Sequence, residues 1–407
     1  MIAGGNNPNS RARFPELVGV MKLASRMSIL GTETAFETLA KARALEAEGR
    51  TIIHLEIGEP DFDTPEHIRE AGKKAIDDGF THYGPSPGLP EARKSVADFV
   101  SKRMGYDVSP DNIVVSPGGK PIMFYTMLAL VEEGDEVIYP NPGFPIYESM
   151  INFSGGTPVP LPLNEESGFT ADIDYLESKI TERTKLIVVN SPNNPCGSVI
   201  PHSDLERIAE LAIKHDLIVL SDEIYHDFYF DGEHTSITQI PGMRERTIIL
   251  DGFSKSYAMT GWRLGWAVLP DALVEPFSRL TTNSVSASTT FTQIAGIAAL
   301  EGSQQPVIDM VGEFKKRRKV IVDGLNSING IDCRTPDGAF YVFPNIRGTG
   351  MTSQEFADAC MYDANVALLA GTAFGEFGQG YARLSFANSE ENLLKGISQI
   401  KEMLAAR

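Results

Sequence analysis

The sequence predicts an α/β fold, in which a large domain with a mostly parallel, doubly wound sheet is joined by a smaller α+β domain from both chain ends. Two observations lead to this prediction. Short apolar, β-branched runs alternate with helical stretches through the middle of the chain, which is typical of a parallel sheet covered by helices. Beyond about residue 300 the pattern changes to a long charged helical stretch followed by short strand-like runs.

The elements of the large domain can be assigned in chain order. Apolar residues at helical spacing predict a helix over Ala35–Glu48, which Gly49 ends. The strand-like runs are Ile113–Val115, Glu136–Tyr139, Leu186–Asn190, Leu217–Ser221, Thr247–Leu250 and Leu264–Leu269. The helical stretches between them include Met123–Val131, Tyr175–Ile180 and Leu205–His215.

The remaining elements belong to the C-terminal part of the chain. An Ala-rich helical stretch over Thr292–Glu301 leads into a charged helix over Val311–Leu325. The strand-like runs that follow are Ala339–Phe343, Ala367–Leu369 and Ala382–Phe386. This order of one long helix and short strands predicts a second, smaller α+β unit.

We therefore expect four segments in the chain of 407 residues, which is too long for one small core. They are an N-terminal arm (1–30), a part of the small domain (31–60), the large domain (61–300) and the small C-terminal domain (301–407). Residues 1 to about 20 carry Gly, Asn, Pro and Arg without periodicity, which is typical of a loose arm.

The composition narrows the class of protein. Apolar residues make up 42% and charged residues 22%, and the formal charge of −18 argues against nucleic acid or an anionic membrane as a partner. The three cysteines form no CxxC pair, which predicts no zinc site or disulfide framework and fits a reducing compartment. The N-terminus lacks the order of a secretory signal, and no apolar run approaches about 18 residues. We expect a cytoplasmic protein.

Four chemically useful side chains come within a few residues after strand-like runs. They are Asn194, Asp222, Tyr225 and Lys255. In a doubly wound sheet ligands bind beyond the carboxyl ends of the strands, so we expect these side chains to meet at one site. Fold maintenance alone does not explain such a cluster.

These residue types suit a pyridine aldehyde that carries a phosphate. Lys255 can form a Schiff base with an aldehyde, and a carboxylate at Asp222 keeps a ring nitrogen protonated, which makes the ring a better electron sink. Tyr225 and Asn194 can both hydrogen-bond the phenolic oxygen of the ring. Taken singly, the four are equally well a solvated lysine, a capping aspartate, a packed aromatic and a turn residue. The joint pattern favours the cofactor.

A separate signature predicts where the phosphate binds. The run Ile113–Lys120 carries a strand into the turn Gly118-Gly119 at a helix start, where backbone N–H groups and the positive helix end favour an anion. Ser254 and Arg263 are further candidates, the arginine because its planar fork suits phosphate oxygens. Arg263 as a structural ion-pair residue is the alternative.

Three motifs in this order resemble class I aminotransferases of the pyridoxal phosphate fold-type I group. They are Ser-Pro-Asn-Asn-Pro-Cys-Gly (191–197), Ser-Asp-Glu-Ile-Tyr (221–225) and Ser-Lys-Ser-Tyr-Ala-Met-Thr-Gly-Trp-Arg (254–263). The likeness is closest to bacterial aspartate-aminotransferase-like enzymes. It runs from about residue 33 to the C-terminus and includes the segments 58–65 and 83–88.

The resemblance implies a complete site for pyridoxal 5′-phosphate. The catalytic residues would be Lys255 as the Schiff-base lysine, Asp222 as the partner of the pyridine nitrogen, and Tyr225, which with Asn194 would bind the phenolic oxygen. Phe144 would stack on the ring. The residues around the phosphate would be Gly118, Gly119, Ser254 and Arg263, and Lys120 would also bind the cofactor. Tyr83 would reach the phosphate of the neighbouring subunit, which implies a homodimer with shared sites.

The resemblance also implies how the substrate binds. Arg383 would clamp the α-carboxylate with two hydrogen bonds, and an arginine within an apolar strand is unusual enough to support this role physically. Gly58 and Asn194 would contact the substrate as well. Lys120 matches a lysine that can pair with a distal carboxylate, although the dipole of the helix that starts there opposes a cation. Its alternative is a surface lysine.

The chain departs from the family pattern at several positions. Cys196 stands where the loop usually has threonine, and Phe144 replaces a more usual tryptophan or tyrosine. The turn at 118–119 lacks hydroxyl donors, and the segment Met27–Phe36, which can contribute to the side-chain pocket, is not close to the aspartate enzymes. None of these departures removes a catalytic function.

The implied reaction moves an amino group between an L-amino acid and a 2-oxo acid in two ping-pong half-reactions through a Lys255 Schiff base. Freed as an uncharged amine, Lys255 would act as general base at the α-carbon, since nearby positive charge and restricted solvation should lower its pKa from about 10.4. Lys120 points to acidic substrates such as aspartate, glutamate or prephenate; aromatic, branched or alanine-type donors stay open.

Three alternatives differ in what they require. A β-lyase or decarboxylase of the same fold would use nearly the same lysine, aspartate and arginine, although the context Ala258–Arg263 favours transamination. A DNA-binding regulator with an inactive aminotransferase domain needs a helix-turn-helix module, for which the roughly 30 residues before the matched region are too few. A structural protein without a cofactor would leave the cluster at the strand ends unexplained.

Overall fold

The computed structural model describes residues 22–407; the loose arm expected over residues 1–20 lies outside the described residues. The larger part is built on a seven-stranded sheet of order β2-β8-β7-β6-β5-β3-β4. Its strands are β2 (Ile113–Ser116), β3 (Glu136–Asn141), β4 (Thr157–Pro162), β5 (Thr184–Asn190), β6 (Ile218–Asp222), β7 (Thr247–Gly252) and β8 (Gly265–Val268). Only β8 runs antiparallel to its neighbours among these strands, which confirms the mostly parallel sheet.

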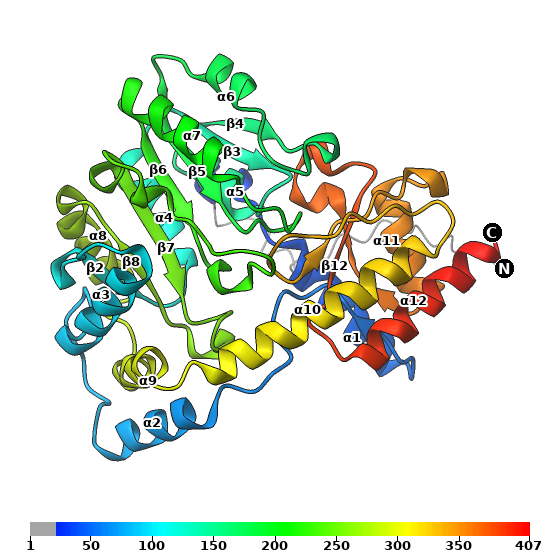
Figure 1. Cartoon of the computed structure of the whole chain (residues 1–407), viewed down its shortest axis with the longest axis horizontal. Helices are drawn as coiled ribbons and strands as arrows, with labels where there is room; N and C mark the ends of the chain where they lie inside the picture. The colour runs from blue at the N-terminus through cyan, green and yellow to red at the C-terminus, as the bar shows by residue number, and fades with distance from the viewer. Residues whose placement is uncertain (1–21) are drawn as a thin grey trace.

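Helices cover both faces of this sheet (Figure 1). One face packs against α4 (Lys120–Leu130), α5 (Ile146–Phe153) and α8 (Asp271–Ser284). The other face packs against α2 (Glu66–Asp77), α3 (Pro90–Met104), α6 (Ile173–Lys179), α7 (His202–Lys214) and α9 (Thr290–Glu301). Because both faces are buried, the strands read as continuous apolar runs, with neighbours such as Leu186 and Ile187 packing on opposite sides.

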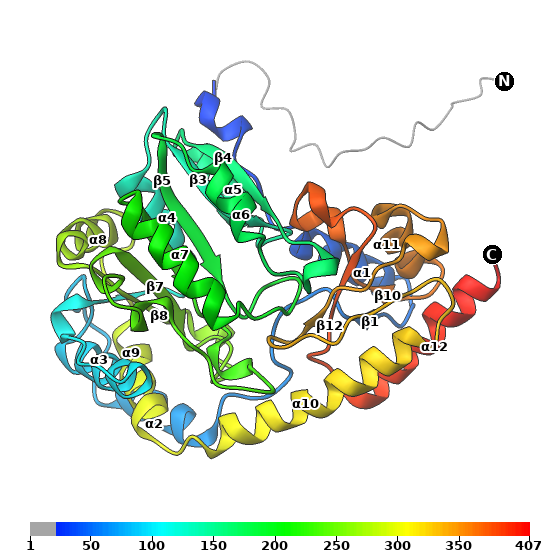
Figure 2. The ribbon, with the colours of Figure 1, turned by 45° about the horizontal axis from the view of Figure 1, so that its top comes forward.

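The smaller part joins segments from both ends of the described chain. Strand β1 (Ile53–His54) pairs in parallel with β10 (Val366–Ala367), and β12 (Ala382–Ser385) lies between β11 (Leu369–Ala370) and β9 (Tyr341–Val342). Its helices are α1 (Thr34–Ala47), α10 (Gln305–Asn326), α11 (Ser353–Tyr362) and α12 (Glu390–Ala405). Figure 2 shows α10 running from the larger part along the smaller one. Domain limits at residues 60 and 300 stay a prediction.

The single strand expected over Ala367–Leu369 is wrong. The chain changes partner at Leu368, a residue that is 2% exposed, so that β10 pairs with β1 while β11 pairs with β12. Both pieces are apolar and buried, and for this reason the composition of the run gave no sign of the break.

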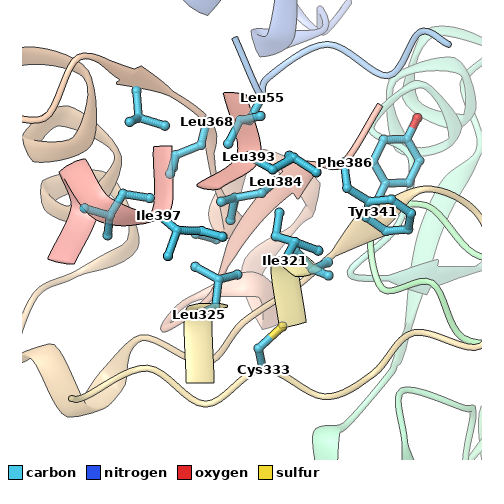
Figure 3. Packing of buried hydrophobic residues seen from close by; sticks show 14 of the residues in the cluster. Leu55, Ile321, Leu325, Cys333, Tyr341, Leu368, Leu384, Phe386, Leu393 and Ile397 are labelled. Carbon is cyan, nitrogen blue, oxygen red and sulfur yellow. The ribbon is translucent and has the colours of Figure 1, made fainter. Parts of the chain in front are cut away.

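The core of the smaller part lies between α10, α12 and the short strands (Figure 3). Ile321 and Leu325 of α10 pack in one cluster with Leu384, Leu393 and Ile397. The same cluster includes Tyr225 and Tyr341, whose hydroxyl groups reach the site described below, so the core and the site share residues. Between residues 22 and 407, no helix has the length and apolar character needed to cross a membrane.

We expect Ile321→Ala to lower the free energy of unfolding by about 2–5 kcal/mol, because it opens a cavity where the side chain is 0% exposed. Ile308→Ala is the matched control on the same helix, since Ile308 is 60% exposed, and should change stability by about 0.5 kcal/mol or less. Urea denaturation followed by circular dichroism measures both. Equal effects of the two substitutions would contradict the packing described here.

Candidate functional site

A cavity of about 520 Å³ opens at the carboxyl ends of β5, β6 and β7. Its wall also includes residues from the smaller part, namely Glu33, Gly58, Tyr341 and Arg383. The position agrees with the rule that ligands bind beyond the carboxyl ends of parallel strands. The residues from the sequence-based prediction that line the cavity are Gly58, Gly119, Lys120, Phe144, Asn194, Asp222, Tyr225, Ser254, Lys255, Arg263 and Arg383.

Asp222, the last residue of β6, is 3% exposed and faces this cavity. Tyr147 donates a hydrogen bond of 2.6 Å to its Oδ2, and the backbone N–H of Ile224 donates one of 3.2 Å to its Oδ1. Burial raises the pKa of Asp222 from 3.8 to about 6, and the two hydrogen bonds act against this rise. A positive group opposite the carboxyl would stabilise its ionised form.

Lys255 lies in the turn after β7 and points its amine at the carbonyl oxygen of Gly58, to which Nζ donates a hydrogen bond of 2.5 Å. A side chain at residue 58 would collide with the Tyr341 hydroxyl, so glycine is needed where the chain passes Tyr341. Removal from water lowers the pKa of Lys255 from 10.5 to about 8, as the sequence led us to expect in direction.

Arg383 of β12 is 4% exposed and reaches the same cavity from the smaller part. Its Nη1 donates to Asn194 Oδ1 at 3.3 Å and its Nη2 to the carbonyl of Glu56, while Nε has no hydrogen-bond partner among residues 22–407. A buried donor without a partner is costly, so the site suits an anionic ligand beside this guanidinium.

Tyr225 holds its place through a hydrogen bond of 2.6 Å between its hydroxyl and that of Tyr341. The sequence did not single out Tyr341 or Tyr147, because neither lies in the three motifs. A weak signal existed for Tyr147, which stands one helical turn after Phe144 and packs edge-on against that ring at 5.8 Å.

The turn before α4 and the segment 254–263 lie against each other, and their groups suit an anion. Gly119 precedes the first turn of α4, and Ser254 and Arg263 line the cavity beside it. Gly118 has φ +87°, and a side chain there would collide with the Arg263 guanidinium, so Gly118 lies against Arg263 and not in the cavity wall. Arg263 Nη1 donates to the carbonyl of Thr260 at 2.8 Å, which holds the fork in position.

Two further predicted residues lie at the edge of the site or outside it. Tyr83 is 91% exposed and does not line the cavity of its own chain, so its predicted reach to the neighbouring subunit stays a prediction. Lys120 forms an ion pair of 2.5 Å with Glu33, a residue that the sequence did not assign to the site. Its Nζ also lies 5.6 Å from the centre of the Phe36 ring and 5.8 Å from that of Phe144.

The side chains that line the cavity fit pyridoxal phosphate. A carboxyl group that lacks a cationic partner (Asp222), an amine with a lowered pKa (Lys255) and an arginine beside a helix start (Arg263) match a ring nitrogen, an aldehyde and a phosphate in turn. Phe144 in the cavity wall offers an aromatic face to the ring. Each of these groups would bind a different part of the cofactor.

Comparisons with known proteins point the same way. The family described as aminotransferase class I and II matches residues 50–400. The aspartate aminotransferase of Pyrococcus abyssi is 42% identical over 87% of this chain and 92% of its own length. Aromatic-amino-acid aminotransferase 2 of Thermococcus litoralis is 39% identical over 94% and 98%. The solved structure of the Thermus thermophilus aspartate aminotransferase with maleate, 35% identical, superposes with a TM-score of 0.91 over 94% and 100%.

In protein stripped of pyridoxal phosphate, we expect the Lys255 amine to react with cyanate with a midpoint near pH 8. The pKa of Lys255 is lowered to about 8, so its uncharged, nucleophilic form appears as the pH rises through that value. Peptide mass spectrometry at pH 6–11 measures the rate, and the exposed Lys185 in the same digest corrects for loss of reagent. A midpoint above pH 10 would contradict the lowered pKa.

Proposed function

The chain belongs to the class I and II aminotransferases, and from this premise we propose that it transfers amino groups from acidic L-amino acids to 2-oxo acids through Lys255, Asp222 and Arg383. Its activity is that of a pyridoxal-phosphate-dependent aminotransferase. The observation that supports the residue roles is that these three side chains, from distant parts of the sequence, line one cavity.

Bound pyridoxal phosphate supplies an aldehyde that captures the amino group and a ring that accepts electrons from the α-carbon. In our proposal Asp222 holds the ring nitrogen, Tyr225 and Asn194 the phenolic oxygen, and Phe144 one face of the ring. The phosphate would be held by the α4 start with Gly119, Ser254 and Arg263, and Gly118 would hold Arg263 in place.

Lys255 would move the proton. With a pKa near 8, about a tenth of Lys255 is uncharged at pH 7, and this free amine can take the α-hydrogen of the substrate through Nζ and return it to the carbon that carried the aldehyde. Glu59 and Glu33 oppose the lowering of this pKa, whereas Arg383 and Lys120 add to it. Burial is the main cause of the lowered pKa of Lys255, and the charges of the cavity wall adjust it in both directions.

Asp222 and Arg383 would fix the two ends of the reacting unit. Tyr147 keeps the Asp222 carboxyl aimed into the cavity, where a positive ring nitrogen opposite would favour its ionised form. Arg383 would bind the α-carboxylate through its guanidinium, whose Nε has no partner among the described residues, and this would turn the α-hydrogen toward Lys255.

Lys120 supports the choice of acidic substrates, because it places a positive charge in the cavity wall. It lies beside Glu33 and Phe36, which line the same cavity. The relatives named above are an aspartate and an aromatic-amino-acid aminotransferase, so either kind of side chain has a precedent. We also propose a homodimer, in which the exposed Tyr83 reaches the phosphate of the neighbouring site. Three free, buried cysteines support a cytoplasmic location.

The pyridoxal form of the enzyme, mixed with aspartate or glutamate and no 2-oxo acid, should give a single burst of one 2-oxo acid per site. The reaction stops there because the amino group stays on the cofactor, which the loss of absorbance of the pyridoxal form reports. With an amino acid that carries a leaving group on its β-carbon, continuous release of pyruvate and ammonia would instead favour a β-lyase of the same fold. Poor reaction with both dicarboxylic donors, beside good reaction with others, would contradict the acidic preference.

Arg383→Lys should raise KM for every amino acid by about 10–100-fold, since it removes the fork that binds the common α-carboxylate. Lys120→Ala should raise KM for aspartate and glutamate by about five- to tenfold and leave alanine within about twofold. Half-reaction kinetics with these three donors separate the two roles. An equal loss for acidic and uncharged donors in Lys120→Ala would contradict a role at the side chain.

A further inference from the structure

Glu33 is an acidic residue in the cavity to which neither the motifs nor the proposed chemistry assigns a role. It immediately precedes α1, and its side chain is 15% exposed. Its carboxylate makes no capping hydrogen bond to α1 and instead lies 2.5 Å from Nζ of Lys120, at the start of α4. The one cation proposed to select acidic substrates thus already carries a carboxylate partner from its own chain.

The surroundings of this ion pair are apolar on two sides. Phe36 and Phe144 flank the Lys120 amine, and Ala35 and Ile57 line the same cavity. An uncharged side chain placed here would find aromatic surface while the ion pair stays intact. No charge would then lose its partner in a partly buried place.

A substrate carboxylate meets different conditions. It must share Lys120 with Glu33, which leaves two anions beside one cation, or it must displace Glu33 and leave that carboxylate without its partner. Either arrangement reduces the gain from the new ion pair, because like charges repel at short range and a partly buried anion loses its compensation. Glu33 therefore acts against the very substrates that Lys120 attracts.

We propose that Glu33 is a specificity-determining residue, which restrains Lys120 so that one cavity accepts uncharged as well as acidic side chains. The inference rests on the proposed function, since it assumes that Lys120 lies near the substrate side chain. It also gives the ion pair a purpose in ping-pong turnover, in which two different substrates occupy the same cavity in succession.

The same geometry also fits the opposite role for Glu33, so the test must distinguish the two roles. Glu33 could hold Lys120 in the orientation that binds a carboxylate, in which case its loss would weaken acidic substrates. Glutamate and glutamine are suitable donors, because they share a shape and differ in charge. The quantity to measure is the ratio of kcat/KM for glutamate to kcat/KM for glutamine.

Glu33→Gln should raise this ratio by about tenfold or more, mainly through a lower KM for glutamate. Glu37→Gln is the matched control: it removes the same charge from an exposed position one turn further along α1 and should leave the ratio within about twofold. Lys120→Ala should then lower the ratio more in the Glu33→Gln background than in the parent. An unchanged or lower ratio in Glu33→Gln overturns the inference.

Binding of succinate, a dicarboxylate with no amino group to transfer, gives a second readout that does not depend on turnover. Calorimetry on the pyridoxal form should show succinate binding about tenfold tighter in Glu33→Gln and in Glu33→Ala, with butyrate unchanged. Equal succinate affinity in parent and variants also overturns the inference. If the parent transfers no amino group from any donor, the proposed function fails; if it does and the ratio stays fixed, only the role of Glu33 fails.

Discussion

The whole site depends on charged groups that are removed from water and have no opposite charge of their own. Asp222 and Arg383 are buried and Lys255 is partly buried, yet none of them forms an ion pair within residues 22–407. Such groups are expensive unless a ligand completes them. In the proposed roles, a pyridine nitrogen, an α-carboxylate and an aldehyde would be the partners of Asp222, Arg383 and Lys255, and the cost in the free protein would then be a source of affinity in the complex.

The charges directly behind the site are arranged in the opposite way. Arg103 of α3 binds Glu223 at 2.9 Å and Asp251 at 2.7 Å, and thereby ties the chain after β6 to the end of β7. These two acids stand beside Asp222 and four residues before Lys255, respectively. These ion pairs hold the ends of β6 and β7 in place, while the unpaired Asp222 and Lys255 face the cavity. The same edge of the sheet therefore carries both the structural ion pairs and the groups of the proposed chemistry.

How far the sequence could predict the site follows from where each residue lies. Four of the site residues lie at or just after the ends of strands, namely Asn194, Asp222, Tyr225 and Lys255. The carboxyl ends of parallel strands lie at the same edge of a sheet. Their association was predictable from the apolar runs alone, as was the mostly parallel sheet. Tyr147, Tyr341 and Glu33 reach the cavity only through the packing of α5, the smaller part and the segment before α1, for which no local pattern exists. Leu368 illustrates the same limit in the fold, because a change of strand partner inside a buried run leaves no mark in composition.

The claim on which everything else depends is that the cofactor is attached to Lys255. Reduction of the pyridoxal form of the enzyme with borohydride fixes pyridoxal phosphate to the amine that carries it, and peptide mass spectrometry then identifies that residue. We predict one phosphopyridoxyl group per chain, on the peptide that contains Lys255, with the other lysines unmodified. A label on Lys120 or on a surface lysine, with Lys255 unmodified, would contradict this account of the site.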